Sequence, residues 1–209
     1  MPRLRVKVCG VTTIADAEAC VEAGVDLIGL NFVAASPRFI DPERAAEIAE
    51  AVRGRVELVG VVADEAAPAL RALCDRVGLD RPQLHGDEPP DFVEALAPVA
   101  FKAVRVGSRA DVDLARRYSG LLLIDARVTG KLGGTGVCVD PALVSALASE
   151  RPVLLAGGLT PENVAEMVQR IRPWGVDVAS GVEANPGVKD RARVAAFVSA
   201  ARGAAMRSP

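Results

Sequence analysis

Aromatic residues and histidine are scarce in this sequence. Phenylalanine, tryptophan and tyrosine together make up 3% of the 209 residues, and His85 is the only histidine. So few aromatic rings provide little surface for stacking nucleic-acid bases, and a formal net charge of −2 gives no general attraction to nucleic acid or to an anionic membrane. No apolar run reaches the roughly 18 residues that a transmembrane helix needs. We therefore expect no nucleic-acid partner and no membrane partner.

Cysteine is present, but not in the pattern of a metal site or a disulfide framework. The four cysteines, Cys9, Cys20, Cys74 and Cys138, are scattered and form no Cys-x-x-Cys pair. With a single histidine in the chain, this spacing argues against a zinc site and against disulfides. Residues 1–5 hold two basic residues that run directly into an apolar segment, unlike a signal peptide. We expect reduced thiols, no metal and a cytoplasmic protein.

Short apolar runs alternate with amphipathic, alanine-rich segments along the chain. The apolar runs predict strands at residues 5–9, 27–32, 57–62, 82–85, 101–105, 121–125, 153–156 and 176–179. The segments between them predict helices at residues 16–23, 42–52, 65–76, 90–96, 109–118, 141–147, 161–171 and 191–201. Each helix follows a residue that can cap its start. The predicted caps are Thr12 or Thr13, Asp41, Asp64, Asp87, Ser108, Asp140, Thr160 and Asp190.

Eight strand–helix units of roughly 26 residues each are typical of a compact (β/α)8 barrel. The strands are continuous apolar runs, which indicates a parallel sheet that is buried on both faces. No shift in composition divides the chain, so we predict an α/β protein with a single-domain (β/α)8 TIM barrel over residues 1–209. Its active site is expected at the C-terminal ends of the strands. The competing architecture is a doubly wound open sheet, but no Gly-x-Gly-x-x-Gly turn follows the first strand, and polar residues end nearly every strand.

The first predicted strand ends on a thiol and a glycine. Alternation along the strand turns Lys7 and Cys9 toward the barrel interior, and Val6 and Val8 toward the helices. Two interpretations of Cys9 stay open: a reactive group at the strand end before Gly10, or a small buried hydrophobic residue. An inward Lys7 either favours the thiolate or is a structural ion-pair partner.

Two acidic residues belong to otherwise apolar strands. Four aliphatic residues precede Asp125, and a carboxylate in that position is costly unless it is paired or used, so we predict a functional role. Asp177 stands between Val176 and Val178 and is predicted to face the barrel interior. A functional role and a salt bridge to an inward cation both remain open for Asp177.

A histidine and an arginine lie near other strand ends. His85 shares the inward parity of its strand with Gln83, and we interpret it as a hydrogen-bonded core residue, the commoner role of a lone histidine. Arg38 follows the second strand and a proline. At the catalytic rim it is suited to hold a carboxylate, although surface arginines are common.

Glycine-rich turns follow the predicted seventh and eighth strands. They contain Gly157 and Gly158 in the first turn, and Ser180 and Gly181 in the second. In this fold these two loops commonly form a phosphate site, because glycine lets backbone N–H groups approach phosphate oxygens. We therefore favour phosphate binding over simple turn chemistry. A third cluster, at residues 133–136, is either a flexible connector or a mobile loop that covers substrate.

Taken together, these motifs resemble the phosphoribosylanthranilate isomerase family of tryptophan biosynthesis. The resemblance runs nearly from end to end and implies a (β/α)8 barrel without metal or cofactor that acts on a small-molecule sugar phosphate. The sequence leaves the choice between a monomer and a homodimer open. The matching segments are residues 7–10, 36–38, 83–88, 125, 133–136, 156–159, 161–164, 176–178, 180–183 and 186–187.

The resemblance also implies a reaction, the Amadori rearrangement of N-(5-phosphoribosyl)anthranilate. Asp125 would be the general acid that protonates the furanose ring oxygen, and Cys9 the general base that removes the C2 proton as a thiolate. Such an acid needs a pKa raised by apolar surroundings, and such a thiol needs a pKa lowered by nearby positive charge. Arg38 would hold the anthranilate carboxylate, Asp177 would lie near the amine, and the glycine turns at residues 157–158 and 180–181 would bind the phosphate.

The chain departs from the family pattern at one place. Residues 137–141 read Val-Cys-Val-Asp-Pro, where the family usually has an aromatic-Asp-Trp turn, often with a lysine before it. The family resemblance implies that this loop closes over the aromatic ring of the substrate. A different sequence here is therefore expected to change that closure, and with it the turnover.

Three other hypotheses fit parts of the pattern. The related sugar-phosphate isomerase of histidine biosynthesis uses an aspartate where Cys9 stands. A carbon–carbon lyase would need a Schiff-base lysine, for which Lys102 is the candidate. A phosphate-binding barrel without activity would have no need for Cys9, Asp125 and Arg38 together.

Overall fold

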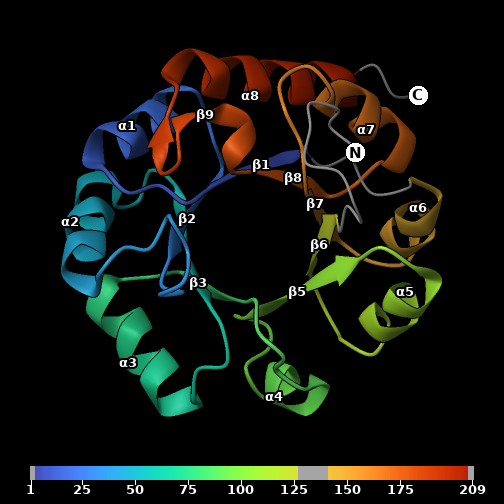
Figure 1. Ribbon diagram of the computed structural model, residues 1–209, viewed down its shortest axis with the longest axis horizontal. Coiled ribbons are helices and arrows are strands. Elements are labelled where there is room, and N and C mark those ends of the chain that lie inside the picture. The colour runs from blue at the N-terminus through green and yellow to red at the C-terminus, as the bar shows by residue number, and fades with distance from the viewer. Residues whose placement is uncertain (1–2, 127–140, 207–209) are drawn as a thin grey trace.

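Eight parallel strands close into a barrel in the order of the sequence (Figure 1). The computed structural model describes residues 3–126 and 141–206. Closure is made by the first and last barrel strands, which pair in parallel from Arg5 with Gly175 to Val8 with Val178. The predicted (β/α)8 barrel is confirmed, and an open sheet is excluded. The barrel strands are β1 (Arg5–Cys9), β2 (Leu27–Asn31), β3 (Glu57–Val62), β4 (Arg81–Leu84), β5 (Phe101–Val106), β6 (Leu122–Ala126), β7 (Val153–Ala156) and β8 (Gly175–Val178).

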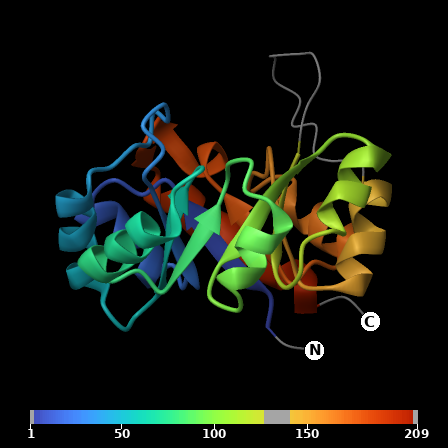
Figure 2. The same cartoon turned by 90° about the horizontal axis from the view of Figure 1, so that it is seen from below.

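A helix follows each barrel strand, and the helices form an outer ring (Figure 1). They are α1 (Ile14–Glu22), α2 (Pro42–Val52), α3 (Ala67–Val77), α4 (Pro90–Ala95), α5 (Arg109–Ala115), α6 (Pro141–Glu150), α7 (Val164–Ile171) and α8 (Arg191–Met206). Between β8 and α8 lie a short 3-10 helix, η1 (Ser180–Val182), and a hairpin of β9 (Glu183–Asn185) and β10 (Val188–Lys189). Figure 2 shows this hairpin on the rim toward which the barrel strands point. The sequence analysis did not predict the hairpin.

The two faces of the strands pack into two separate layers. Val6 and Val8 are fully buried between barrel and helices, as their parity predicts. Lys7 is fully buried as well, but on the interior face, and Asp177 is buried opposite it. Each buried aliphatic side chain contributes roughly 1.5–3 kcal/mol to folding. The apolar residues that fill the interior are Leu27, Val59, Phe101, Ala103, Leu123, Leu154 and Ala156.

Four of the predicted helix caps are confirmed. The side chains of Thr13, Asp41, Ser108 and Asp190 each accept a hydrogen bond from a backbone N–H in the first turn of the helix that follows. At Ser108 the bond is reciprocal, because the Asp111 side chain accepts from the Ser108 N–H. Such capping satisfies donors that would otherwise lack a partner at the start of a helix.

Three other predicted caps are wrong, because these residues form hydrogen bonds within loops or turns and do not lie at the start of a helix. Asp64 has a φ of +58° and accepts a hydrogen bond from the Asp87 N–H at 2.7 Å, so neither residue caps α3 or α4. Thr160 precedes a turn rather than a helix, and its N–H donates to Asn163 Oδ1 at 2.8 Å. As a result α7 begins at Val164, three residues later than predicted.

No helix in residues 3–126 and 141–206 is long and apolar enough to span a bilayer. The predictions that concern residues 133–136, the departure at residues 137–140, Cys138 and the cap Asp140 lie outside the described residues.

Candidate active site

A cavity of about 260 Å³ lies at the C-terminal ends of the barrel strands. Asn31, Gln83 and His85 contribute to its polar lining. A larger cavity of about 400 Å³, next to Trp174 at the opposite ends of the strands, contains none of the predicted site residues. The predicted residues that line the C-terminal cavity are Cys9, Arg38, Asp125, Gly157, Gly158, Asp177 and Ser180.

Lys7 lies below Cys9 and forms an ion pair inside the barrel. Its Nζ is 3.0 Å from Asp177 Oδ1, and its side chain has no solvent exposure. Burial alone would lower the pKa of Lys7, but Asp177 and Cys9 together raise it above the usual value. Gly29 on β2 makes room for both groups, since a Cβ there would lie 2.8 Å from Cys9 Sγ and 3.0 Å from Lys7 Nζ. The salt-bridge alternative for Asp177 is therefore confirmed.

The thiol of Cys9 differs from the prediction. We expected nearby positive charge to lower its pKa, but burial raises the pKa and outweighs the opposing effects of Lys7 and Lys189, while Asp177 adds to the rise. Burial therefore favours the thiol form of Cys9, and further positive charge close by would favour the thiolate.

Asp125 has the environment that a general acid needs. Burial raises its pKa, Asp177 raises it further, and Arg105 opposes both. Arg105 is paired in register with Asp125 at the end of β5, and its side chain is exposed. The sequence analysis did not single out Arg105, although the inward parity of β5 falls on it.

We predicted that His85 is a hydrogen-bonded core residue; it is hydrogen-bonded to Gln83, but its side chain is 25% exposed and lines the cavity. Its Nδ1 is 3.1 Å from Gln83 Nε2, and its Nε2 is 3.9 Å from Asp125 Oδ2. Burial lowers the pKa of His85, and the cations Arg105, Lys102 and Lys7 lower it further. The ring is therefore neutral near pH 7 and faces the predicted acid. Its inward parity at a strand end, the same feature that identified Cys9, was the available signal.

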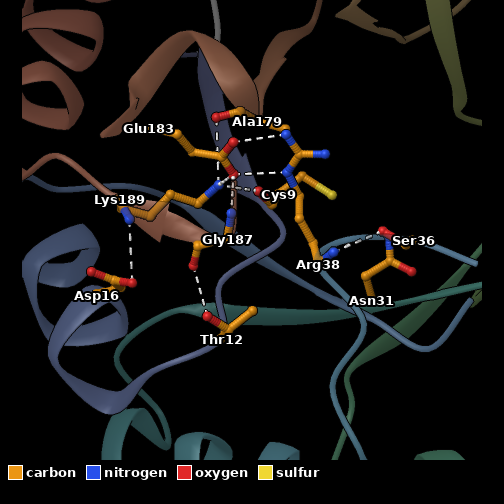
Figure 3. A network of polar contacts seen from close by, with 10 residues as sticks. All are labelled: Cys9, Thr12, Asp16, Asn31, Ser36, Arg38, Ala179, Glu183, Gly187 and Lys189. Carbon is orange, nitrogen blue, oxygen red and sulfur yellow. Dashed lines mark hydrogen bonds and ion pairs between the residues drawn. The ribbon is translucent and has the colours of Figure 1, made fainter. Parts of the chain in front are cut away.

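Arg38 reaches the cavity from the loop after β2 and is held by Glu183. Its Nε and Nη2 donate to the two carboxylate oxygens of Glu183 at 2.7 Å each (Figure 3). Despite burial, hydrogen bonds from Arg38 and Lys189 lower the pKa of Glu183 to about 2. Glu183 and Lys189 are site residues that the sequence analysis missed.

The glycine turns after β7 and β8 lie against each other. Gly157 and Gly158 have φ values of +92° and +64°, which favour glycine. A Cβ on Gly181 would lie 1.9 Å from the carbonyl oxygen of Leu159, so only glycine allows this approach of the two turns. Gly181 thus shapes the predicted phosphate site without lining the cavity, while Ser180 lines it.

Lys102 does not meet the requirements of a Schiff-base lysine. Its Nζ is 3.0 Å from Glu88 Oε2 and donates to the carbonyls of Leu84, Gly86 and Ala103. Its side chain is 4% exposed and does not line the C-terminal cavity. These contacts argue against a Schiff base at Lys102 and so against the lyase hypothesis.

The arrangement is suited to moving protons at a bound anion. It combines a carboxyl group with a raised pKa, a thiol beside cations, an arginine at the rim and two glycine turns. Among the described residues, no group of three or more His, Cys, Asp or Glu side chains is placed to hold a metal ion.

Comparison with known proteins gives one consistent result. The profile of the family described as N-(5'phosphoribosyl)anthranilate (PRA) isomerase matches residues 6–200. The N-(5'-phosphoribosyl)anthranilate isomerase of Myxococcus xanthus is 48% identical over 205 residues, which cover 95% of this chain and 96% of the relative.

Solved structures agree with the sequence comparison. The phosphoribosyl anthranilate isomerase of Thermotoga maritima is 37% identical, with a TM-score of 0.88 over 96% of this chain and 99% of that chain. A phosphoribosyl anthranilate isomerase in complex with reduced 1-(o-carboxyphenylamino)-1-deoxyribulose 5-phosphate is 35% identical, with a TM-score of 0.85 over the same shares of the two chains.

Proposed function

Because the chain belongs to the phosphoribosylanthranilate isomerase family, we propose that it catalyses the Amadori rearrangement of N-(5'-phosphoribosyl)anthranilate. The product is 1-(2-carboxyphenylamino)-1-deoxyribulose 5-phosphate, an intermediate of tryptophan biosynthesis. One observation carries the proposal: a single cavity collects Asp125 with a raised pKa, Cys9 beside Lys7, and the glycine turns after β7 and β8.

Asp125 acts first, as the general acid. Its carboxyl proton goes to the furanose ring oxygen, and the bond between this oxygen and C1 breaks while the nitrogen lone pair forms a C1=N bond. The product of the step is an open-chain Schiff base with a positive charge on nitrogen. Burial and Asp177 support this role, because both keep the carboxyl group of Asp125 protonated at a higher pH than usual.

Cys9 acts second, as the general base. The Schiff-base cation adds positive charge beside the thiol, and together with Lys7 it favours the thiolate, which forms as the thiol releases its proton to solvent. The thiolate removes the C2 proton, and the electron pair of the C–H bond neutralises the cation to give an enol-amine. Return of a proton to C1 and loss of the C2 hydroxyl proton then give the ketone.

Binding is divided among the remaining residues. Arg38 holds the anthranilate carboxylate, and Asp177 lies near the amine. Gly157, Gly158, Ser180 and Gly181 take the phosphate through backbone N–H groups. Two side-chain proton carriers suffice for this isomerisation, so we propose that it needs no metal or cofactor.

We also propose that residues 1–209 act as one domain in the cytoplasm. A Thermotoga maritima relative is described as dimeric, and a monomer or homodimer is proposed here.

A fluorescence assay tests the function directly. Purified protein is mixed with freshly generated phosphoribosylanthranilate, and the loss of anthranilate-type emission is followed over time. We expect decay at a rate proportional to protein concentration. No decay above the rate of spontaneous hydrolysis would contradict the proposal.

A further inference from the structure

Arg38 enters the cavity with two of its nitrogen atoms already engaged. Nε and Nη2 donate to Glu183, which leaves Nη1 outside this pair. Figure 3 shows Glu183 against one edge of the guanidinium group and the third nitrogen on the other side. A carboxylate clamp that is already bound to a carboxylate should attract a second one poorly, unless another cation offsets the first.

Lys189 is that cation. Its side chain has no solvent exposure, and its Nζ donates to Glu183 Oε1 at 2.7 Å, to the Cys9 carbonyl at 2.7 Å and to the Ala179 carbonyl at 3.4 Å. An ammonium group has three N–H donors, so all of them have partners. Lys189 therefore joins the end of β1 to the segment after β8 while neutralising Glu183.

Glu183 accepts from four donors. Besides Arg38 and Lys189, the Gly187 N–H donates to Glu183 Oε1 at 3.3 Å. Charge-assisted bonds of this kind are stronger than neutral ones and fix the groups in place. Two cations share one buried carboxylate, so the cluster keeps a net charge of +1 on the cavity side.

The hairpin that carries these two residues is tied to the β1–α1 region. Thr12 Oγ1 donates to the Gly187 carbonyl at 2.7 Å, and the Lys189 N–H donates to Asp16 Oδ2 at 3.3 Å (Figure 3). The hairpin is therefore held at its turn and at the end of β10, which fixes Glu183 relative to Cys9.

Arg38 itself lies across the backbone that follows Cys9. A Cβ on Gly10 would lie 2.3 Å from Arg38 Cδ, and Gly10 has a φ of +72°. Gly10 thus leaves room for the aliphatic part of Arg38, and Glu183 holds its guanidinium end.

We propose that Glu183 and Lys189 are positioning residues for the carboxylate site at Arg38, an inference that rests on the proposed function. Glu183 fixes the guanidinium in one orientation before substrate arrives, so less side-chain freedom is lost on binding. Lys189 offsets the charge of Glu183, so Arg38 still attracts the ring carboxylate. Because Lys189 donates to both Glu183 and the Cys9 carbonyl, it also fixes the position of this site relative to the Cys9 thiol.

The test compares two ligands that differ only in the carboxylate. One is reduced 1-(o-carboxyphenylamino)-1-deoxyribulose 5-phosphate, and the other is its phenylamino counterpart without the carboxyl group. Calorimetry gives the dissociation constants of both for wild type, Lys189→Met and Glu183→Gln. Glu50→Gln, which removes an exposed partner of Arg53, is the matched control. Thermal unfolding verifies that each variant is folded, and Lys189→Gln replaces Lys189→Met if the latter does not fold.

We expect Lys189→Met to weaken the carboxylate ligand about 10-fold or more, and to change the other ligand less than about 2-fold. Glu183→Gln raises the charge of the cluster but loosens Arg38, and we expect it to weaken the carboxylate ligand about 3- to 10-fold. Tighter binding of that ligand by Glu183→Gln would overturn the positioning role. If the variants weaken both ligands equally, the cluster has only a structural role and the inference is overturned. The proposed function would not be affected by that result. If wild type itself does not distinguish the ligands, the carboxylate site of the proposed function fails as well.

Discussion

Two buried lysine–carboxylate pairs in this barrel have the same separation and different surroundings. Lys7 Nζ is 3.0 Å from Asp177, and Lys102 Nζ is 3.0 Å from Glu88, with all four side chains less than one-tenth exposed. The first pair faces the barrel interior beneath Cys9. The second lies on the outer side of β5, beside the ring of Tyr118.

The difference lies in what else each ammonium group contacts. Lys102 donates to three backbone carbonyls in addition to Glu88, so its hydrogen-bonding capacity is used by the fold. Lys7 interacts with Asp177 and Cys9, both of which line the cavity. Burial and pairing are therefore poor evidence of catalysis by themselves. The face of the strand and the neighbouring group distinguish the two lysines.

The largest effect should come from removing the proton carriers on the cavity side. We expect Cys9→Ser and Asp125→Asn each to lower kcat by roughly 10²–10⁴-fold, because each removes a group that transfers a proton in the reaction. The Tm should stay within about 2 °C of wild type, since neither change opens a cavity. Steady-state fluorescence kinetics and thermal unfolding measure both quantities. Turnover like that of wild type in either variant would mean that the acid or base is wrongly assigned.

The outer pair should behave in the opposite way. Lys102→Met leaves Glu88 buried without its cation, and we expect a loss of about 3–5 kcal/mol in the free energy of unfolding. The kcat of the folded enzyme should not change. The double variant Lys102→Met/Glu88→Gln removes both charges and should regain part of the loss. Urea denaturation gives the stabilities, and a drop in kcat beyond the unfolded fraction would show that the outer pair affects the site.

The sequence predicted the fold and most of the cavity lining for a simple reason. Alternation in β1 separates Val6 and Val8 from Lys7, and the same period of two applies to Asp177 on β8. Applied to β5, it also turns Lys102 away from the interior, where Phe101 and Ala103 lie. Strand parity alone would therefore have predicted that Lys102 points away from the barrel interior, which argues against the lyase hypothesis.

Other features depend on contacts that no local pattern contains. Arg38 and Glu183 are 145 positions apart, and Glu183 opens a strand of three residues that shows no alternation. The pKa of Cys9 depends on two opposing effects, because burial raises it and the nearby Lys7 lowers it. The sizes of both effects depend on the folded structure. The hydrogen bond of His85 was predicted, but its place in the cavity was not, because a general expectation about lone histidines was preferred to its position at a strand end.

A smaller effect should follow from breaking the inner pair. Lys7 lowers the pKa of Cys9 against the effect of burial, so Lys7→Met should raise that pKa further. The limb of the kcat profile that requires the thiolate should then move to higher pH, and kcat at neutral pH should fall by about 10-fold. The pH dependence of kcat measures this shift. A lower kcat with an unmoved limb would leave Lys7 with a structural role like that of Lys102.

The smallest effect concerns a third buried lysine pair, Lys189 with Glu183, and appears in stability. The pKa of Glu183 falls from an ordinary 4.5 to about 2 in the folded protein, so its contribution is fully present above pH 4.5 and is lost as the pH falls toward 2. Glu183→Gln should therefore have a Tm a few degrees below wild type, by about 2–4 °C for each kcal/mol lost, and the difference should be constant from pH 5 to 7. Between pH 4.5 and 2 the difference should shrink, because protonation of Glu183 in wild type mimics the substitution. Calorimetric scans across this range measure it. A Tm difference that stays constant down to pH 2.5 would mean that the hydrogen-bonding geometry of Glu183, and not its charge, stabilises the hairpin. The Lys189–Glu183 pair would then have a structural role, like the Lys102–Glu88 pair.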